Sequence, residues 1–324
     1  MAVTRNPKSQ IPNPKQIRNT KLQKKNKIIF IIGPTAVGKS ELAVKLAKKI
    51  NGEIVSADSM SFYRRMDIIS SKPAKHLRKQ IPHHLIDIIT PEEEYNVAKF
   101  IKESNRKIKE IIKRKKIPIV AGGSGLYVDS MLYGIFKQVK KSAVIRDGLM
   151  REAGLFGSEY VYNKLKSVDP EAAERIHPNN LRRVIRALEV CFLTMGKFSE
   201  LKQKRSGLMD KYDVKLFGLN LERDKLYQRI DARVDKMFDE GLLKEVKDLL
   251  KRKLSKTARQ ALGIKEVEGF LKGAYDLGKV KYLLKLNTRH FAKRQLTWFR
   301  RNKDIIWLDA LGDRRKIINE ITKG

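Results

Sequence analysis

One stretch near the N-terminus constrains the fold of this chain more than any other. An apolar segment, 27–32, is followed by Gly33-Pro34-Thr35-Ala36-Val37-Gly38-Lys39-Ser40, and an amphipathic segment, 41–50, comes directly after it. A buried strand, a G-x-x-x-x-G-K-S loop and a helix in that order form the phosphate-binding loop pattern. The pattern predicts that the chain holds a di- or triphosphate; a chance glycine-rich turn is the weaker alternative.

Each residue type in this loop has a chemical reason. The glycines let the backbone wrap tightly enough for its N–H groups to point at phosphate oxygens. Lys39 adds a mobile positive charge, the Ser40 hydroxyl is a ligand for Mg²⁺, and the start of the following helix favours an anion. We therefore expect the eight residues from Gly33 to Ser40 to bind the phosphates, with Mg²⁺ as cofactor.

Apolar segments alternate with helical ones along the chain, which predicts an α/β fold with a parallel, doubly wound sheet flanked by helices. The further strands are expected at 53–58, 85–89, 117–121, 212–221 and 305–309, and long helices at 97–116, 223–253 and 280–301. In such sheets the carboxyl ends of the strands border the ligand crevice. Asp58 ends the second strand and is a catalytic candidate, although a role as helix N-cap fits its position equally well. Gly33, Asp58 and Gly122 should meet at one edge.

The charge balance points to a large anionic partner. The 324 residues include 71 Lys and Arg against 36 Asp and Glu, a net charge of +35. A kinase for a small molecule does not need that excess, whereas a nucleic acid would explain it. A general lysine bias of the genome would account for much of it as well. Residues 1–26 contain no Asp or Glu and have no hydrophobic periodicity, so we expect a disordered basic tail.

Other features narrow the possibilities. Cys191 is the only cysteine, which excludes an internal disulfide and a cysteine-based zinc site, and we expect it to be packed in a core. The pair His83-His84 has no third ligand at metal spacing and is expected to be structural. There is no apolar run long enough to span a bilayer and no signal peptide. We therefore expect a cytoplasmic protein without membrane or protein partners, acting as a monomer.

Residues 139–207 show only helical patterns, which predicts an all-helical insertion domain between the two parts of the phosphate-loop core, 27–138 and 208–324. Its helices are expected at 143–153, 158–168, 170–176 and 181–195. Arg182, Arg183 and Arg186 fall on neighbouring faces of the last one, with Asn180 as its expected N-cap. Arginines at this spacing favour phosphate contacts over a merely solvated face. In 280–301, basic residues alternate with aromatic ones, which suits unpaired RNA bases, although the leucines there indicate a buried face.

Sequence blocks along nearly the whole chain, from Ile28 to Asp309, resemble the bacterial tRNA dimethylallyltransferases. They are the phosphate loop, Asp58-Ser59-Met60, Met66-Asp67-Ile68, Lys72-Pro73, His83-His84-Leu85-Ile86-Asp87-Ile88, and the segments 122–127, 175–179, 183–189 and 292–298. Many enzymes share the phosphate loop, but its combination with Asp58-Ser59-Met60 and with the segment 292–298 is specific.

The resemblance implies transfer of a dimethylallyl group from dimethylallyl diphosphate to N6 of the adenosine just 3′ of the anticodon, in tRNAs that read codons beginning with U. The phosphate loop would then hold a departing diphosphate. Asp58 matches the residue that accepts the proton of the adenine amine. Ser124 replaces the family's usual threonine beside the reacting centre, and Arg233 matches a diphosphate contact with Arg229 as a second one.

The resemblance also implies a set of tRNA-binding residues, distributed over the core and the insertion. They are Asp58, Ser59, Met60, Ser61, Ser124, Arg146, Arg182, Arg183, Val184, Ile185, Arg186, Lys293 and Arg294. The chain departs from the family pattern at Ser61, at 69–71, at 195–198 and at Ile264. These departures put the affinity for the anticodon loop, or the range of tRNAs, in question more than the reaction.

Three other functions compete with this interpretation. A phosphate-loop kinase would favour a metal-binding Asp at the end of the strand 117–121, where this chain has Gly122-Gly123. An isopentenyltransferase for free adenine nucleotides shares the fold and the donor but needs no RNA-binding face. A non-catalytic RNA-binding protein would not need Lys39 and Asp58 together.

Overall fold

The computed structural model describes residues 25–135, 139, 142–203 and 205–323. Within this part of the chain, six parallel strands form one sheet in the order β3-β2-β4-β1-β5-β6. The strands are β1 (Lys27–Ile32), β2 (Gly52–Ser56), β3 (His83–His84), β4 (Ile117–Gly122), β5 (Asp213–Asn220) and β6 (Ile306–Asp309). The predicted parallel α/β sheet is confirmed. The predicted basic tail falls almost entirely outside the described residues.

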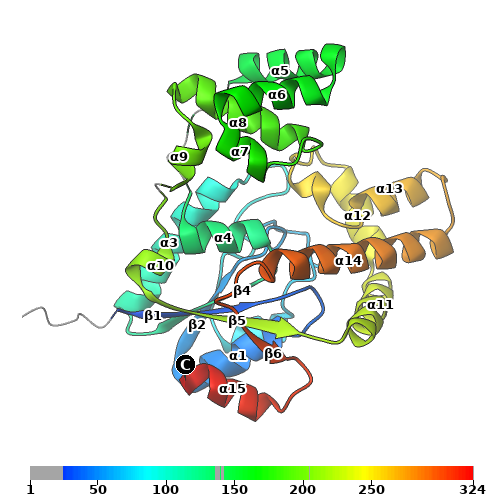
Figure 1. Cartoon of the computed structure of the whole chain (residues 1–324). Helices are drawn as coiled ribbons and strands as arrows, with labels where there is room; N and C mark the ends of the chain where they lie inside the picture. Colours follow the sequence, from blue (N-terminus) through cyan, green and yellow to red (C-terminus); the bar gives the residue numbers. More distant parts are fainter. Residues whose placement is uncertain (1–24, 136–138, 140–141, 204, 324) are drawn as a thin grey trace, which may run out of the picture.

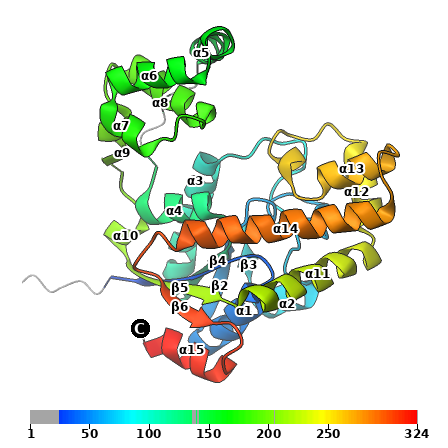
Figure 2. The ribbon, with the colours of Figure 1, turned by 45° about the vertical axis from the view of Figure 1, so that its right-hand side comes forward.

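Helices cover both faces of the sheet (Figures 1 and 2). Alternate residues of β1 enter different cores, as the two-residue period of a strand requires. Ile29 and Ile31 pack with α1 (Lys39–Ile50) and α15 (Arg314–Lys323). Phe30 packs on the other face with α3 (Val97–Lys113) and α4 (Gly125–Tyr133). Both faces of β1 are therefore buried, which accounts for its nearly continuous apolar sequence.

Two long helices, α11 (Arg223–Asp239) and α14 (Leu277–Phe299), lie side by side along the sheet (Figure 2). The shorter elements of the core are α2 (Lys75–Gln80), α10 (Leu208–Lys211), α12 (Leu242–Leu250), the 3₁₀ turn η2 (Ala258–Gln260) and α13 (Ile264–Leu271). The single helix predicted at 223–253 is wrong. Gly241, with φ of 98°, ends α11 and starts α12 in a conformation that continues no right-handed helix.

The third strand was predicted at 85–89, and this placement is wrong. The structure has a two-residue strand at His83–His84, which pairs with Ile54 and Val55. Leu85 and Asp87 have φ values of 62° and 56°, in the left-handed region that interrupts a strand. The apolar side chains of this segment therefore pack from a turn and not from a strand.

Between β4 and β5 the described chain forms a helical insertion that projects from the core beside α4 (Figure 1). Its helices are α5 (Ala143–Phe156), α6 (Ser158–Val168), α7 (Pro170–Arg175), α8 (Leu181–Thr194) and α9 (Phe198–Gln203). They enclose a separate core that includes Leu149, Leu165 and Leu188. Cys191 is buried, as expected. Asn180 precedes α8, but its side chain makes no capping hydrogen bond, so that prediction is wrong in its chemistry.

The chain enters and leaves the insertion at two touching segments. Gly134 has φ of 77°, and a Cβ atom there would lie 2.2 Å from the carbonyl oxygen of Ser206. A Cβ atom on Gly207 would lie 2.1 Å from the carbonyl oxygen of Leu132. Only glycine permits this close approach of the two backbones. No helix among the described residues is long and apolar enough to cross a membrane.

Candidate active site

The phosphate loop follows β1 with the backbone that its glycines permit. Gly33 has φ of 144°, and a Cβ atom there would lie 2.6 Å from the carbonyl oxygen of Leu219 on the neighbouring strand β5. Gly38 has φ of 98° and immediately precedes α1. A side chain at either position would strain the backbone, and at Gly33 it would collide with β5. The loop therefore requires these two glycines.

Two cations, Lys39 and Arg233, point into this loop, and neither forms an ion pair with a carboxylate in the described part of the chain. Lys39 donates from Nζ to the carbonyl oxygen of Pro34 at 2.6 Å. Burial lowers the pKa of Lys39 to about 8; nearby Asp58 opposes this shift and the charge of Arg233 adds to it. Arg233, on α11, donates to Thr35 Oγ1 at 3.2 Å and to the carbonyl oxygen of Ser71 at 3.0 Å. Burial lowers the pKa of Arg233 as well. A nearby anion stabilises the charged form of a buried cation, so Lys39 and Arg233 favour an anionic ligand.

Arg229 lies one helical turn before Arg233 on α11, as the spacing predicted. Its Nη1 atom is 3.5 Å from the carbonyl oxygen of Val37, so it also reaches the phosphate loop. The predicted diphosphate-binding residues of the loop and of α11 are thus brought together by the fold.

Gln295, on α14, was not identified as a site residue from the sequence. Its Oε1 atom accepts the backbone N–H of Thr35 at 2.8 Å, and its Nε2 atom donates to the carbonyl oxygen of Gly123 at 2.9 Å. A Cβ atom on Gly123 would lie 2.3 Å from that Nε2 atom, so the side chain amide needs a glycine there. The sequence carried one usable signal, because Gln295 stands within the segment 292–298 that resembles the family.

Asp58 was predicted to end the second strand; β2 ends at Ser56, and Asp58 lies two residues beyond it, at the same edge of the sheet. Its Oδ1 atom accepts the backbone N–H of Met60 at 2.9 Å within a turn, and no helix begins there. The N-cap alternative for Asp58 is therefore wrong, although the side chain does cap a turn. Ser124 Oγ accepts the backbone N–H of Ser59 at 3.1 Å. The end of β4 is thereby tied to the turn that carries Asp58.

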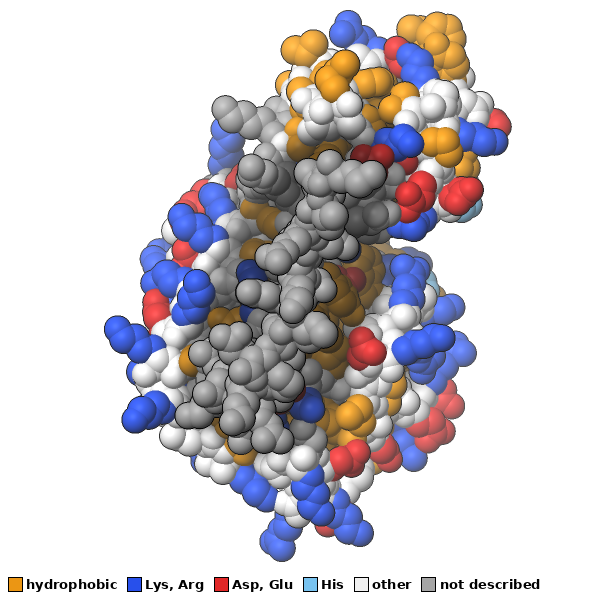
Figure 3. Space-filling model, turned by 60° about the vertical axis from the view of Figure 1, so that its left-hand side comes forward, with side chains coloured by type: hydrophobic (Ala, Val, Ile, Leu, Met, Phe, Trp, Pro, Cys, Tyr) orange, Lys and Arg blue, Asp and Glu red, His pale blue; other side chains and the backbone are white. Residues whose placement is uncertain are grey.

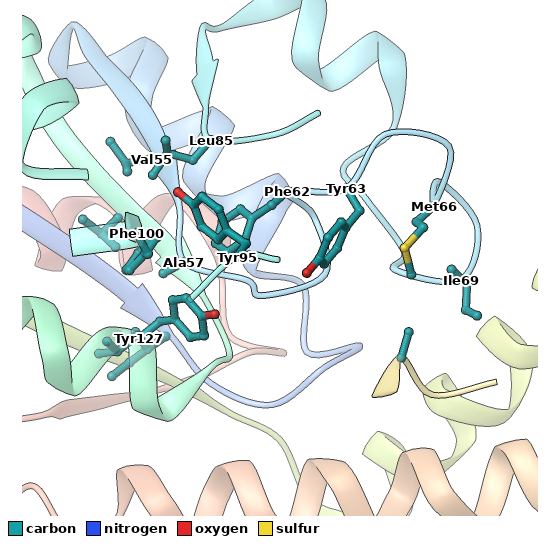
Figure 4. Close-up of a cluster of buried hydrophobic side chains, with 14 of the residues drawn as sticks. Val55, Ala57, Phe62, Tyr63, Met66, Ile69, Leu85, Tyr95, Phe100 and Tyr127 are labelled. Atoms are coloured by element: carbon teal, nitrogen blue, oxygen red, sulfur yellow. The ribbon is translucent and has the colours of Figure 1, made fainter. Parts of the chain in front are cut away.

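An aromatic cluster supports this turn from behind (Figure 4). The ring of Phe62 lies 4.8 Å from that of Tyr95, 5.5 Å from that of Phe100 and 5.7 Å from that of Tyr127, measured between centroids. Burial raises the pKa of Tyr127 to about 12, so this phenol stays neutral. Ser61 is buried next to the cluster. Buried packing thus begins at Ser61, three residues after Asp58, at the end of the turn that carries this carboxylate.

A cavity of about 840 Å³ joins these parts. Asp58, Ser40 and the two buried cations line it, together with Gln295. Cations predominate over carboxylates in its wall: Lys39, Lys72, Lys75, Arg78, Arg229, Arg233, Lys236 and Arg314, against Glu41, Asp58, Asp67 and Glu240. The predicted meeting of three strand ends is confirmed, because Gly122 lies against Ala57 and Gly123 lies against Gly33.

The side chains of His83 and His84 both contact other groups of the protein. His84 Nε2 lies 2.7 Å from Glu53 Oε2, and His83 Nδ1 lies 2.7 Å from the carbonyl oxygen of Ile81. In the part of the chain that the structure describes, no group of three or more His, Cys, Asp or Glu could hold a metal ion. For Mg²⁺ the side chain that fits is Ser40, a hard oxygen ligand that lines the cavity at the start of α1.

The predicted tRNA-binding residues of the insertion separate into three groups. Arg182 and Arg183 are exposed. Arg146 and Arg186 both bind Glu189, a carboxylate with no exposed surface, at 2.8 and 2.5 Å. The side chains of Val184 and Ile185 are packed in the core of the insertion, which corrects the expectation that they are available to tRNA.

On α14, Lys293 and Arg294 are exposed, and the guanidinium of Arg294 lies 5.8 Å from the centroid of the Phe291 ring. Figure 3 shows that Lys and Arg side chains border much of the visible face of the core, whereas apolar side chains gather on the insertion. The exposed apolar side chains there include Val144, Leu155, Phe156 and Met195. The insertion therefore offers both arginines and apolar side chains to a partner.

The family model described as IPP transferase matches residues 61–302, most of the chain. The chain belongs to the IPP transferase family. A tRNA dimethylallyltransferase of Halothermothrix orenii is 48% identical over 300 residues, which cover 91% of this chain and 92% of that protein. One of Alkaliphilus oremlandii is 49% identical over 286 residues, with coverage of 87% and 91%.

Solved structures of IPP transferases have the same fold. The tRNA isopentenylpyrophosphate transferase of Bacillus halodurans is 41% identical, with a TM-score of 0.69, over 92% of this chain and 95% of that one. A eukaryotic dimethylallyltransferase acting on tRNA is 33% identical, with a TM-score of 0.76, over 88% and 74% of the two chains. The predicted phosphate-loop fold with a helical insertion is confirmed, and so is the resemblance to the tRNA dimethylallyltransferases.

Proposed function

We propose that this chain transfers a dimethylallyl group from dimethylallyl diphosphate to N6 of the adenosine just 3′ of the anticodon of tRNA, in tRNAs that read codons beginning with U. One observation carries this proposal. A single cavity combines an anion cradle, formed by the phosphate loop with Lys39 and Arg233, with the carboxylate of Asp58. The similarity to tRNA dimethylallyltransferases along almost the whole chain supports the same reaction.

In the proposed reaction, the amine nitrogen of the adenine attacks the carbon that carries the diphosphate. The new C–N bond forms as the C–O bond breaks, and the electron pair of that bond leaves with the diphosphate. Asp58 accepts the proton that the amine loses. Lys39, Arg233 and the loop amides stabilise the negative charge that grows on the leaving group. Bound at Ser40, Mg²⁺ would neutralise part of the same charge.

The positions of the cations favour tRNA over a free nucleotide as acceptor. Arg182 and Arg183 lie on the insertion and Lys293 and Arg294 on α14, outside the residues that line the cavity. A free nucleotide would not reach such distant side chains, whereas a folded RNA would. Drawing a stacked adenine out of its loop costs about a few kcal/mol, which these phosphate contacts would offset. A tRNA substrate also implies that the enzyme works in the cytoplasm.

A kinase remains the competing function for any phosphate loop. In this chain β4 ends in Gly122 and Gly123, and the carboxylate that faces the loop comes from the turn after β2. That arrangement supports a role for Asp58 toward an acceptor in the cavity. It gives β4 no strand-end carboxylate that could bind a metal–nucleotide complex. A single chain also contributes every group of the cradle, so we propose that the enzyme acts as a monomer.

The test uses dimethylallyl diphosphate labelled in the isoprenoid, Mg²⁺, and either unmodified tRNA or AMP as acceptor. Label should move to tRNA and not to AMP, and nuclease digestion should recover it on one adenosine beside the anticodon. Label on AMP alone would support the free-nucleotide enzyme. Transfer of the γ-phosphate of ATP, without transfer of the isoprenoid, would support the kinase.

A further inference from the structure

Arg314 lies far from the phosphate loop in the sequence but beside it in the structure. It is in the first turn of α15, after the last strand of the sheet and beyond the segment that the family model matches. Three isoleucines of α15, at 317, 318 and 321, are buried in the core that includes Leu42 and Leu46 of α1. Lys49 of α1 also donates a hydrogen bond to Asn319 of α15. The docking of α15 on α1 therefore fixes where Arg314 points.

The guanidinium of Arg314 occupies the space that the missing side chain of Gly38 leaves open. A Cβ atom on Gly38 would lie 3.0 Å from Arg314 Nη2. Arg314 also lines the same cavity as Lys39, Arg229 and Arg233. The end of the chain thus contributes a cation at the last glycine of the phosphate loop, directly before α1.

One nitrogen of this guanidinium has no hydrogen-bond acceptor. Arg314 Nη1 is buried and has no partner among the described residues. The nearest carboxylates in the sequence are used elsewhere, since Asp309 accepts the N–H of Leu311 and Asp313 accepts the N–H of Arg315. Arginine stays charged, and a buried N–H group without an acceptor is unfavourable, so the position calls for an oxygen ligand.

We propose that Arg314 is a further diphosphate-binding residue, which contacts a phosphate oxygen of the isoprenoid donor at the Gly38 end of the loop. The proposal rests on the function proposed above. It adds the C-terminal helix to the elements that hold the leaving group, besides α1 and α11. Arg314 then stabilises the diphosphate through a charge-assisted hydrogen bond from a nitrogen that no group of the described residues uses.

Titration calorimetry with inorganic diphosphate and Mg²⁺ tests this contact without the reaction. Arg314→Gln should weaken binding by about ten- to a hundredfold, the range for one lost hydrogen bond to a charged group. Arg315→Gln is the matched control, because the neighbouring side chain of Arg315 is exposed. The affinity of this variant for diphosphate should equal that of the wild type. Arg314→Lys keeps the charge but loses the planar fork, so it should restore part of the affinity.

Steady-state kinetics and tRNA binding distinguish this role from a structural one. In Arg314→Gln the KM for dimethylallyl diphosphate should rise while the affinity for tRNA stays unchanged. Unchanged diphosphate affinity in Arg314→Gln, with or without a lower melting temperature, would overturn the proposal while leaving the proposed function intact. A wild-type protein that does not bind diphosphate at all would contradict both.

Discussion

The side-chain oxygen of Gln295 accepts the backbone N–H of Thr35 at 2.8 Å, across the interface between α14 and the phosphate loop. One amide of the loop is therefore bound by the protein itself and is not available to a phosphate. The same side chain holds Gly123 at the end of β4. Because Lys293 and Arg294 are exposed on the same helical turn, a surface that faces solvent is joined directly to the phosphate loop.

Gln295→Ala should destabilise the fold and impair catalysis together. It removes both hydrogen bonds and leaves the Thr35 N–H and the Gly123 carbonyl without their partner, at a cost of about 1–3 kcal/mol. Gln295→Glu keeps the acceptor for Thr35 and loses the donor to Gly123, so it separates the two contacts. Urea unfolding and the KM for dimethylallyl diphosphate measure the effects. Wild-type values for both quantities in Gln295→Ala would show that the amide only fills space.

Asp58→Asn should abolish most of the transfer while leaving tRNA bound. The amide keeps an oxygen that can accept the Met60 N–H but no longer takes up a proton, so the turn is retained and the base is lost. We expect turnover to fall by at least about a hundredfold, the lower range for loss of a general base. Single-turnover rates and filter binding of tRNA provide the two readouts. Asp239→Asn, an exposed change at the end of α11, is the control and should be silent. A normal single-turnover rate in Asp58→Asn would exclude the proton-acceptor role.

Substitutions of the insertion's arginines should have different effects, depending on whether the arginine is exposed or bound to Glu189. Arg182 and Arg183 are exposed, so replacing both with Ala should weaken tRNA binding and make the slope of log affinity against log salt shallower by roughly 1.5. Their removal should leave thermal stability unchanged. An unaltered salt slope would mean that this face of α8 does not meet RNA.

Replacing Arg146 and Arg186 with Ala should act on the fold of the insertion instead. Both bind Glu189, and their loss would leave a buried carboxylate without a counter-charge, at a cost of about 3–5 kcal/mol. Hydrogen exchange across α5 and α8 measures this. Restoration of protection by the further change Glu189→Gln would identify the unpaired charge as the cause.

Glu53 should make the protein sensitive to acid. Burial alone would raise its pKa, but hydrogen bonds from Arg114, His84 and Lys116 outweigh that effect and lower the pKa from 4.5 to about 2. Between these two values the unfolded chain binds more protons than the folded one, so stability falls as the pH drops through this window. Glu53→Gln should lower stability at pH 6 by on the order of 2 kcal/mol and flatten its decline toward pH 3.

Urea unfolding at the two pH values measures this difference, with the exposed Glu159→Gln as control. An acid profile of Glu53→Gln that runs parallel to that of the wild type would contradict the assignment. The contacts of Glu53 lie at the end of the sheet away from the phosphate loop, so activity of the folded protein near neutral pH should be retained.

The features that could be predicted from the sequence are those that depend on residues close together along the chain. The spacing of Gly33, Gly38 and Lys39 is contiguous, and Asp58 follows a buried strand, so both could be placed at the ligand edge without coordinates. Gln295 and Arg314 could not, because their roles depend on which helix docks against the loop. The segment of Leu85 and Asp87 was wrongly predicted as a strand because a short apolar run does not reveal a left-handed φ. The ion pairs of Arg146 and Arg186 with Glu189 could not be predicted, because Glu189 gives no sign in the sequence that it is buried.

Gly134 and Gly207, at the base of the insertion, affect how the sequence of such a protein can vary. Because the backbones at Gly134 and Gly207 touch, the core closes on itself below the insertion, and the sheet order does not depend on what lies between them. Residues in between can be lengthened, shortened or exchanged as a cassette while the catalytic cavity keeps its walls. The RNA contacts proposed for the insertion and the chemistry proposed for the cavity are thereby open to separate variation.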